Sequence, residues 1–400
     1  MNKIKLFMNS LIKGGLIIVF AMCLFNINLL AQEDGISPGE LGGQVNIIGT
    51  GVPFLDIGPD SRSGAMGNAG VALSPDINSQ HWNPAKFAFI ESKSGIGLSY
   101  TPWLRKLVND INLYYLTGFY RLDDMQVLSA SLRYFTLGEI MIRESKEDIG
   151  YSTKPNEFAI DIAYSRVLSD YFSGSVAFRY IYSNLYQGIG ADESMEAGKS
   201  FAADIAFFYK NNVEWFGNSS DLTAGINISN IGTKISYDSG NTKQFIPTNL
   251  GLGLGYKTDL DDYNSFTLTV DLNKLMVPTP PLGSSKEDIE DYRDRYYNTS
   301  VIKAMFKSFS DAPGGAKEEF QEIRYSVGAE YWYAKQFAIR GGYFHEHENK
   351  GNRKLFTAGI GLKFNMLTLD ASYIIPVVQN HPLANTIRFS LAVDLDSFSK

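Results

Sequence analysis

Apolar and polar residues alternate with a period of two along most of the chain, from about residue 95 to its end. Side chains on a β-strand point alternately to its two faces, so this period predicts strands. Fourteen segments carry the pattern, near residues 95–103, 111–121, 126–137, 157–168, 171–182, 200–210, 221–237, 248–258, 265–274, 323–333, 337–345, 355–364, 367–375 and 386–395. Most approach the ~9–11 residues that a tilted transmembrane strand needs, and an even number suits a closed antiparallel barrel.

The two faces of these strands differ in chemistry. In one segment Leu128, Leu132 and Tyr134 alternate with Ser129 and Arg133. A soluble sandwich or barrel also alternates, but its apolar face points inward and packs densely. Here the second face is made of Gly, Ser, Ala, Asp and Arg, which is too polar for a core and is typical of a lumen. The sequence therefore predicts an all-β fold, a 14-stranded antiparallel transmembrane β-barrel.

The connections between the segments are alternately short and long. Residues 122–125 and 169–170 form short connections, whereas 138–156 and 183–199 form long ones. Outer-membrane barrels have short periplasmic turns and long external loops, so the first strand is expected to run outward. The connection 211–220 is longer than this scheme predicts.

The N-terminus has the pattern of an export signal. Three lysines precede an apolar stretch at residues 16–30, and Ala31 stands before a polar segment. We expect a signal peptide at 1–31 and secretion to the cell outer membrane; the alternative is an uncleaved anchor helix. Lipid attachment at Cys23 is disfavoured because the bulky Met22 precedes it. Residues 32–94 are expected to form a Gly-rich plug, and residues 95–400 the barrel.

The longest loop, at about residues 275–322, shows helical rather than strand spacing. Tyr292 and Tyr296 belong to one predicted amphipathic helix, and Phe306 and Phe309 to a second. Their apolar faces require burial, either against the barrel rim or against a partner. Sequence alone favours neither.

Composition removes several classes of function. The formal charge of −7 argues against a groove for nucleic-acid phosphates. A single cysteine excludes a disulfide framework and a cysteine-ligated zinc site. Beyond the N-terminus no apolar run is long enough for a membrane-spanning helix. The abundance of Tyr (23), Phe (26) and Gly (37) fits a β-rich protein.

The densest motif lies in residues 49–103. Ala69-Gly70-Val71-Ala72, followed by Asn83-Pro84-Ala85, resembles FadL-type outer-membrane proteins, whose barrels have fourteen strands and a lumenal plug. A narrower resemblance is to the PorV family of the Bacteroidetes type IX secretion system, which is itself FadL-like. It rests on Pro53-Phe54-Leu55, Pro59-Asp60-Ser61-Arg62, Gly64 through Gly70, Ser79 through Ala85, and Ser99-Tyr100-Thr101-Pro102-Trp103-Leu104.

The resemblance to the PorV family implies a secretion component that is not an enzyme. Such proteins bind cargo carrying a type IX C-terminal signal domain and associate with the large SprA (Sov) translocon. They deliver the cargo to a surface attachment complex that contains the PorU sortase. External loops are expected to contact the cargo, first through Tyr292, Tyr296, Phe306 and Phe309, because aromatic residues dominate interface energetics. The loop 138–156, with Ile140 and Met141, is the second candidate.

The motif residues themselves also have a physical interpretation. Gly64, Gly67 and Gly70 permit close backbone approach or positive φ, and Asn83-Pro84 forms turns. Trp82 is an amphipathic side chain that could lock the plug against the wall. We interpret the motif as shaping the plug, with direct ligand contact as the alternative.

No constellation in the sequence predicts catalysis, a cofactor or a metal. Gly198-Lys199-Ser200 lacks the first glycine of a phosphate-binding loop, and His345, Glu346 and His347 fit a solvated rim. Lumenal charges are expected to pair with one another or with the plug; these are Asp161, Arg179, Asp204, Asp271, Glu330, Arg340 and Arg388. The rival functions are an outer-membrane lipid hydrolase and a FadL-type transporter of fatty acids or other hydrophobic molecules. Small polar inward faces disfavour the transporter.

Overall fold

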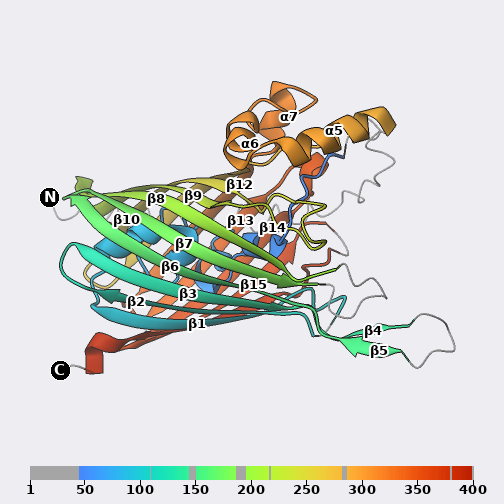
Figure 1. Ribbon diagram of the computed structural model, residues 1–400. Coiled ribbons are helices and arrows are strands. Elements are labelled where there is room, and N and C mark those ends of the chain that lie inside the picture. Colours follow the sequence, from blue (N-terminus) through green and yellow to red (C-terminus); the bar gives the residue numbers. More distant parts are fainter. Residues whose placement is uncertain are drawn as a thin grey trace.

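Fourteen strands close into one antiparallel barrel (Figure 1). The computed structural model describes residues 45–108, 110–143, 150–185, 195–215, 218–281, 286–378 and 381–398. The barrel strands are β1 Ser94–Pro102, β2 Asn112–Arg121, β3 Gln126–Thr136, β6 Asn156–Ser169, β7 Phe172–Asn184, β8 Gly198–Trp215, β9 Asn218–Gly232, β10 Asn249–Asp259, β11 Ser265–Leu275, β12 Arg324–Tyr333, β13 Phe337–His345, β14 Lys354–Phe364, β15 Leu367–Pro376 and β16 Ile387–Asp394. Each strand pairs with its neighbours in the chain, and β16 returns to β1 in the register Gly95↔Asp394. The predicted strand number and closure are confirmed.

Apolar side chains point outward and polar side chains point inward. On β3, Leu128 and Leu132 are 42% and 39% exposed, whereas Ser129 and Arg133 are each 3% exposed. The same alternation runs through the neighbouring strands β2 and β6 and through the more distant β11. An outward apolar band of this kind is stable only in contact with lipid, so the barrel is a transmembrane one.

Long and short connections gather at opposite ends of the barrel (Figure 1). The prediction of a long turn at 211–220 was wrong, because β8 and β9 remain paired from Asn211↔Leu222 out to Trp215↔Asn218. The prediction of a strand reaching residue 237 was also wrong. Strand β9 ends at Gly232, and Ile235 instead forms an isolated bridge with Gln244 inside the following loop.

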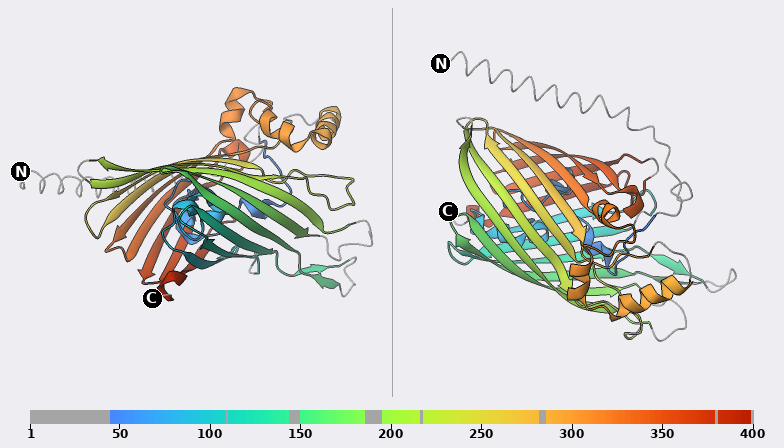
Figure 2. Two further views of the ribbon diagram at one scale, coloured as in Figure 1. Left: turned by 60° about the vertical axis from the view of Figure 1, so that its left-hand side comes forward. Right: turned by 90° about the horizontal axis from the view of Figure 1, so that it is seen from above.

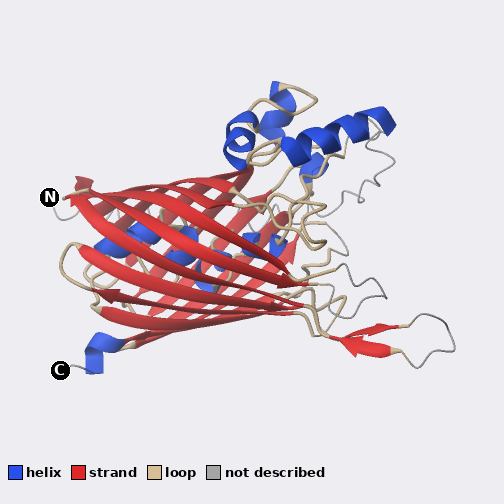
Figure 3. Cartoon of the chain, viewed as in Figure 1, coloured by secondary structure: helices blue, strands red, loops and turns tan. Residues whose placement is uncertain are grey.

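The N-terminal segment lies inside the barrel and carries four short helices: η1 Pro53–Asp56, α3 Ser61–Ala65, α4 Ser79–Trp82 and η2 Pro84–Phe89. Figure 3 shows them surrounded by the strands. Asp60 begins α3 by accepting a hydrogen bond from Ser63 N (2.8 Å), and Asn83 begins η2 by accepting one from Ala85 N (3.0 Å). We call the described part of this segment, residues 45–93, the plug.

The loop between β11 and β12 forms a helical arm beside the barrel (Figure 2). It contains α5 Lys286–Asn298, α6 Val301–Lys307 and α7 Ala316–Gln321. The sequence predicted the first two helices and missed α7. The loop between β3 and β6 contains a hairpin, β4 Ile140–Ile142 and β5 Tyr151–Thr153, which was also not predicted. The short helices η3 Glu348–Lys350 and η4 Leu395–Phe398 complete the fold.

Among the described residues, no helix is both long and apolar enough to cross a membrane. The expected signal peptide lies outside the described residues and stays a prediction.

Candidate functional site

Helix α3 is tied to the barrel wall by buried charges. Arg62 contacts Glu330 of β12 through two hydrogen bonds, Nε to Oε2 at 3.0 Å and Nη2 to Oε1 at 2.8 Å. The same guanidinium reaches Asp76 of the plug at 2.7 Å. Arg340 of β13 also donates to Glu330 (2.6 Å) and continues to Asp370 of β15 (2.6 Å). The expected pairing of Glu330 and Arg340 is therefore confirmed, and the plug forms part of their network.

A second group of contacts holds the stretch after α3. The carboxylate of Asp271 accepts hydrogen bonds from Gly70 N (2.6 Å) and Val71 N (2.8 Å). The plug backbone comes this close because the facing strand β10 presents glycines. A Cβ atom on Gly253 would lie 2.6 Å from Asp271 Oδ1 and 2.9 Å from Ala72 N. The alternating glycines of β10 thus leave room for the plug.

The remaining lumenal charges that were expected to pair are also accounted for. Arg179 of β7 contacts Asp161 of β6 and Asp204 of β8, the latter at 2.9 Å. Arg388 of β16 has a weaker partner, Asn68 Oδ1 of the plug at 3.2 Å, and its Nε atom has no hydrogen-bond partner. Buried charges are costly unless they are paired or hydrogen-bonded, and Arg179 meets this condition more fully than Arg388 does.

The motif glycines lie where the plug passes closest to its neighbours. A Cβ atom on Gly64 would collide with the Arg388 guanidinium. Gly67 has φ +69°, and a Cβ atom there would lie 2.5 Å from the Tyr343 carbonyl oxygen. At Gly70 the obstacle is the indole of Trp82. At all three positions an added side chain would collide with the plug or the barrel wall. That the motif shapes the plug stays a prediction.

Trp82 contacts the wall in a different way from the one expected. Its indole Nε1 donates to Asp60 Oδ1 within the plug (2.6 Å), and only its backbone carbonyl accepts from Asn227 of the wall (3.0 Å). Burial, and next the neighbouring Asp76, raise the pKa of Asp60. The adjoining Asn83 and Pro84 make the direct wall contacts, through Asn83 Nδ2 to Phe207 O (3.0 Å) and Ser165 Oγ to Pro84 O (2.7 Å).

A cavity of about 550 Å³ lies between the start of the plug and the wall, and both apolar and charged side chains line it. Its apolar lining includes Phe54, Trp103, Phe135 and Phe344. The expectation of small polar inward faces was therefore wrong for these aromatic residues, although Arg324, Glu346 and Arg353 line the same cavity. The signal was present in the sequence, because Phe135 stands on the inward face of β3, at the end nearest the long loop.

The four aromatic residues predicted to bind cargo fall into two pairs, one packed on the barrel rim and one exposed. Tyr296 of α5 lies on the rim, where its hydroxyl accepts a hydrogen bond from Phe245 N (2.9 Å) and its ring packs on the Phe245 ring at 4.8 Å. Tyr292 packs on Tyr296 at 5.6 Å. Phe306 and Phe309 instead remain 74% and 46% exposed. Of the two alternatives for the arm, burial on the rim holds for α5. Burial of Phe306, on α6, and Phe309, just after it, against a partner stays a prediction.

Lys234 strengthens the rim contact of α5. Its ammonium group donates to Tyr296 O (2.7 Å) and Tyr297 O (3.1 Å), and it lies 4.1 Å from the centre of the Phe245 ring. Burial, and next the charge of Lys243, lower the pKa of Lys234 to about 8.

A buried ion cluster holds α7 against the barrel rim. Lys274 of β11 contacts Glu319 (3.0 Å) and Glu322 (2.5 Å). Lys350 of η3 contacts Glu322 (3.0 Å) and Glu318 (2.5 Å). Asn46, at the start of the plug, donates to Glu318 Oε1 at 2.9 Å. We call these residues the rim cluster; it connects the arm, the β13–β14 loop and the plug, and the sequence did not reveal it.

The second predicted contact surface lies on the β4–β5 hairpin. Ile140 and Met141 are 42% and 55% exposed there. Among the described residues, no group of three His, Cys, Asp or Glu side chains is arranged to hold a metal ion.

Barrel, plug and arm together define the class of protein: a plugged, 14-stranded barrel of the outer-membrane type. The family model for the type IX secretion system protein PorV matches residues 42–282, and the chain belongs to this family.

Among solved structures, the chain is similar to the Pseudomonas putida toluene transporter TodX, at 11% identity over 88% of this chain and 98% of that one, with a TM-score of 0.48. It is also similar to the Ralstonia pickettii toluene transporter TbuX (12% identity, 84% and 97% covered, TM-score 0.44). A third is a Pseudomonas aeruginosa FadL homologue (12% identity, 87% and 99% covered, TM-score 0.39). No curated protein matches the chain.

Proposed function

We propose that this protein binds the C-terminal signal domain of type IX cargo at a SprA (Sov) type translocon and delivers it to the attachment complex that contains a PorU-type sortase. The observation that carries the proposal is the arm. The arm combines exposed aromatic side chains with helices that are packed and ion-paired against the barrel rim. A loop that only connects two strands needs neither feature. Exposed apolar patches on otherwise ordered surfaces mark interaction sites.

The packing of the arm against the rim matters for affinity. Phe306 and Phe309 stand on and just after α6, whose inner side is packed through the buried Ala304 and Met305. The rim cluster fixes the segment that follows. A contact surface that is already ordered loses less conformational entropy on binding, so more of its contact energy is available for affinity.

The plug favours a role for this protein at the cell surface over a role in passing a solute through the barrel. Its contacts with Glu330 and Asp271 are buried and bridge strands on one side of the lumen, and those of Asn83 and Pro84 bridge the other. Within this account the chain breaks no bond and acts by binding and hand-over.

Affinity purification of the tagged protein from gently solubilised native outer membranes tests the proposal. We expect mass spectrometry to detect a giant barrel and surface proteins sharing a C-terminal signal domain. Phe306→Ala should reduce cargo recovery, whereas Phe178→Ala, which removes an equally exposed phenylalanine from the lipid-facing wall, should not. Recovery of this chain without protein partners would overturn the proposal.

A FadL-type transporter of hydrophobic small molecules is the second candidate, and the 550 Å³ cavity favours it. Cavities of this size that combine aromatic side chains with polar groups hold small ligands. Extractable lipid in the purified protein, together with the absence of cargo, would support this candidate.

A further inference from the structure

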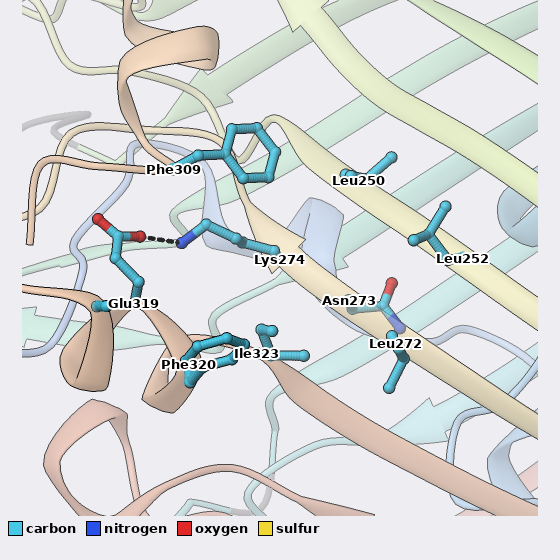
Figure 4. A pocket seen from close by; sticks show the side chains of 10 residues that line it. Leu250, Leu252, Leu272, Asn273, Lys274, Phe309, Glu319, Phe320 and Ile323 are labelled. Atoms are coloured by element: carbon cyan, nitrogen blue, oxygen red, sulfur yellow. Dashed lines mark hydrogen bonds and ion pairs between the residues drawn. The ribbon is translucent and has the colours of Figure 1, made fainter.

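A groove of about 400 Å³ runs between the outer surface of the barrel and the arm (Figure 4). Its barrel side is formed by Leu250 and Leu252 of β10 and Leu272 of β11. Its arm side is formed by Phe309, Ala316, Phe320 and Ile323. The groove is separate from the lumen, because these leucines stand on the outward faces of their strands.

The barrel side of the groove continues into the lipid-facing surface. Leu254 and Val270, the next outward positions along β10 and β11, are 64% and 38% exposed. Leu252 and Leu272 are paired in the same register, as are Leu254 and Val270. The groove is therefore an extension of the membrane-contacting band, roofed by helix α7.

The charged side chains that line the groove, Lys274 and Glu319, are paired with each other. Lys274 lies in the lining, yet its ammonium group is held by Glu319 at 3.0 Å and Glu322 at 2.5 Å, and it lies 5.7 Å from the centre of the Phe309 ring. A cation paired in this way offers no free charge to an anionic ligand. The occupant best suited to the groove is uncharged and apolar.

We propose that the groove holds an acyl chain of a membrane lipid, which packs between the arm and strands β10 and β11. Hydrocarbon already contacts the adjoining leucines, so a chain can enter without crossing water. The chain contributes apolar contact beneath Phe320, which is 67% exposed without it. The inference does not depend on cargo binding; it identifies a lipid site that steadies the arm.

The test uses the full-length protein in nanodiscs that contain a phosphatidylcholine with a photo-reactive diazirine near the middle of one acyl chain. We expect adducts concentrated in peptides covering residues 309–323 and 250–252, relative to the outward face of β3. Ala316→Trp fills the groove and should lower labelling of these peptides by about tenfold, since losing the contact of about two methylene groups changes an equilibrium by that factor. Ala130→Trp, on the outward face of β3 and five strands away, should leave the labelling unchanged.

A second variant covers the case in which Ala316→Trp disturbs the arm. Phe320→Ala widens the groove and should also reduce labelling at 309–323, with protease resistance of the arm as the check on its folding. Equal labelling of the groove and of β3 in the wild-type protein would overturn the proposal. So would cross-linking of the groove peptides to a protein in native membranes with no lipid adducts there. Either result leaves the cargo-binding proposal standing, because that proposal is judged by partner recovery.

Discussion

Arg62 of the plug and Glu330 of strand β12 form a two-point contact, at 3.0 Å and 2.8 Å, in the interior of the barrel. Their side chains are 11% and 1% exposed. Paired geometry of this kind fixes both the distance and the orientation of the partners. The contact therefore defines where α3 sits in the lumen.

We expect Glu330→Gln to loosen the plug, because Arg62 and Arg340 would both lose their shared carboxylate. Breaking a buried ion pair costs about 3–5 kcal/mol. Hydrogen exchange of the amides in residues 61–67 measures the effect, and it should accelerate. Glu139→Gln is the control, since the Lys154–Glu139 pair is exposed and 3.8 Å long; such pairs contribute about 0–1 kcal/mol. Unchanged protection in Glu330→Gln would show that this contact does not hold the plug.

Gly67→Ala should displace the plug backbone. The residue has φ +69°, and the added Cβ would lie 2.5 Å from the backbone oxygen of Tyr343. Overpacking of this kind costs about 1–3 kcal/mol, to which the left-handed backbone adds about 1–2 kcal/mol. Gly49→Ala is the matched control within the plug, because nothing lies within 4 Å of its Cβ position. Protease resistance of the plug should fall only in the first variant; equal resistance in both would contradict the geometry.

The stability of the arm should depend on the protonation of Asp311. Burial, and then the charges of Glu319 and Glu322, raise the pKa of Asp311 to about 6 from 3.8, while a hydrogen bond from Thr279 N opposes the rise. The folded arm thus binds more protons than the unfolded one between these values, so this group lowers the free energy of unfolding as the pH rises. Asp311→Asn should stabilise the arm relative to the wild type by an amount that grows from pH 4 to pH 6 and is constant above.

Hydrogen exchange of α6 and α7, corrected for intrinsic rates, measures this difference. The opposite titration of Glu318, whose pKa its Lys350 contact lowers against the effect of burial, is present in both proteins and cancels. A difference that shrinks as the pH rises would mean that Asp311 is stabilised in its charged form.

Two variants should distinguish the arm aromatic residue that stabilises the fold from the one that is exposed on the surface. Tyr296→Phe leaves Phe245 N without its acceptor and should weaken packing of α5 on the rim by about 1–3 kcal/mol. Phe306→Ala changes a surface side chain, so its effect on stability should stay within about 0.5 kcal/mol. Denaturant titration monitored by proteolysis of the arm distinguishes them. A large stability loss in Phe306→Ala would assign this side chain to folding.

The strands could be predicted because each obeys a local rule. The alternation of Leu128 with Ser129 is visible in the sequence, and lipid contact makes it a strict requirement. The motif glycines also predicted close packing of the backbone. The residues that they pack against, such as Tyr343, could not be predicted from the sequence. The alternation of short and long connections followed from their lengths, except where β8 and β9 pair beyond the expected turn.

The rim cluster could not be predicted because it depends on distant contacts. By alternation Lys274 belongs to the outward, lipid-facing side of β11, where a charge is unfavourable. Its partners Glu319 and Glu322 come 45 and 48 residues later and lie on or just after α7. No local pattern shows that α7 folds back over this lysine, so neither the cluster nor the groove beside it was evident.

The central claim is that the exposed aromatic surface of the arm contacts cargo. Placing a photo-reactive phenylalanine analogue at position 306 in living cells, with the same analogue at position 178 as the lipid-facing control, tests it most directly. The account predicts adducts between position 306 and the C-terminal signal domains of type IX cargo, and none from position 178. Absence of cargo adducts at position 306 in a folded, membrane-inserted protein would contradict it.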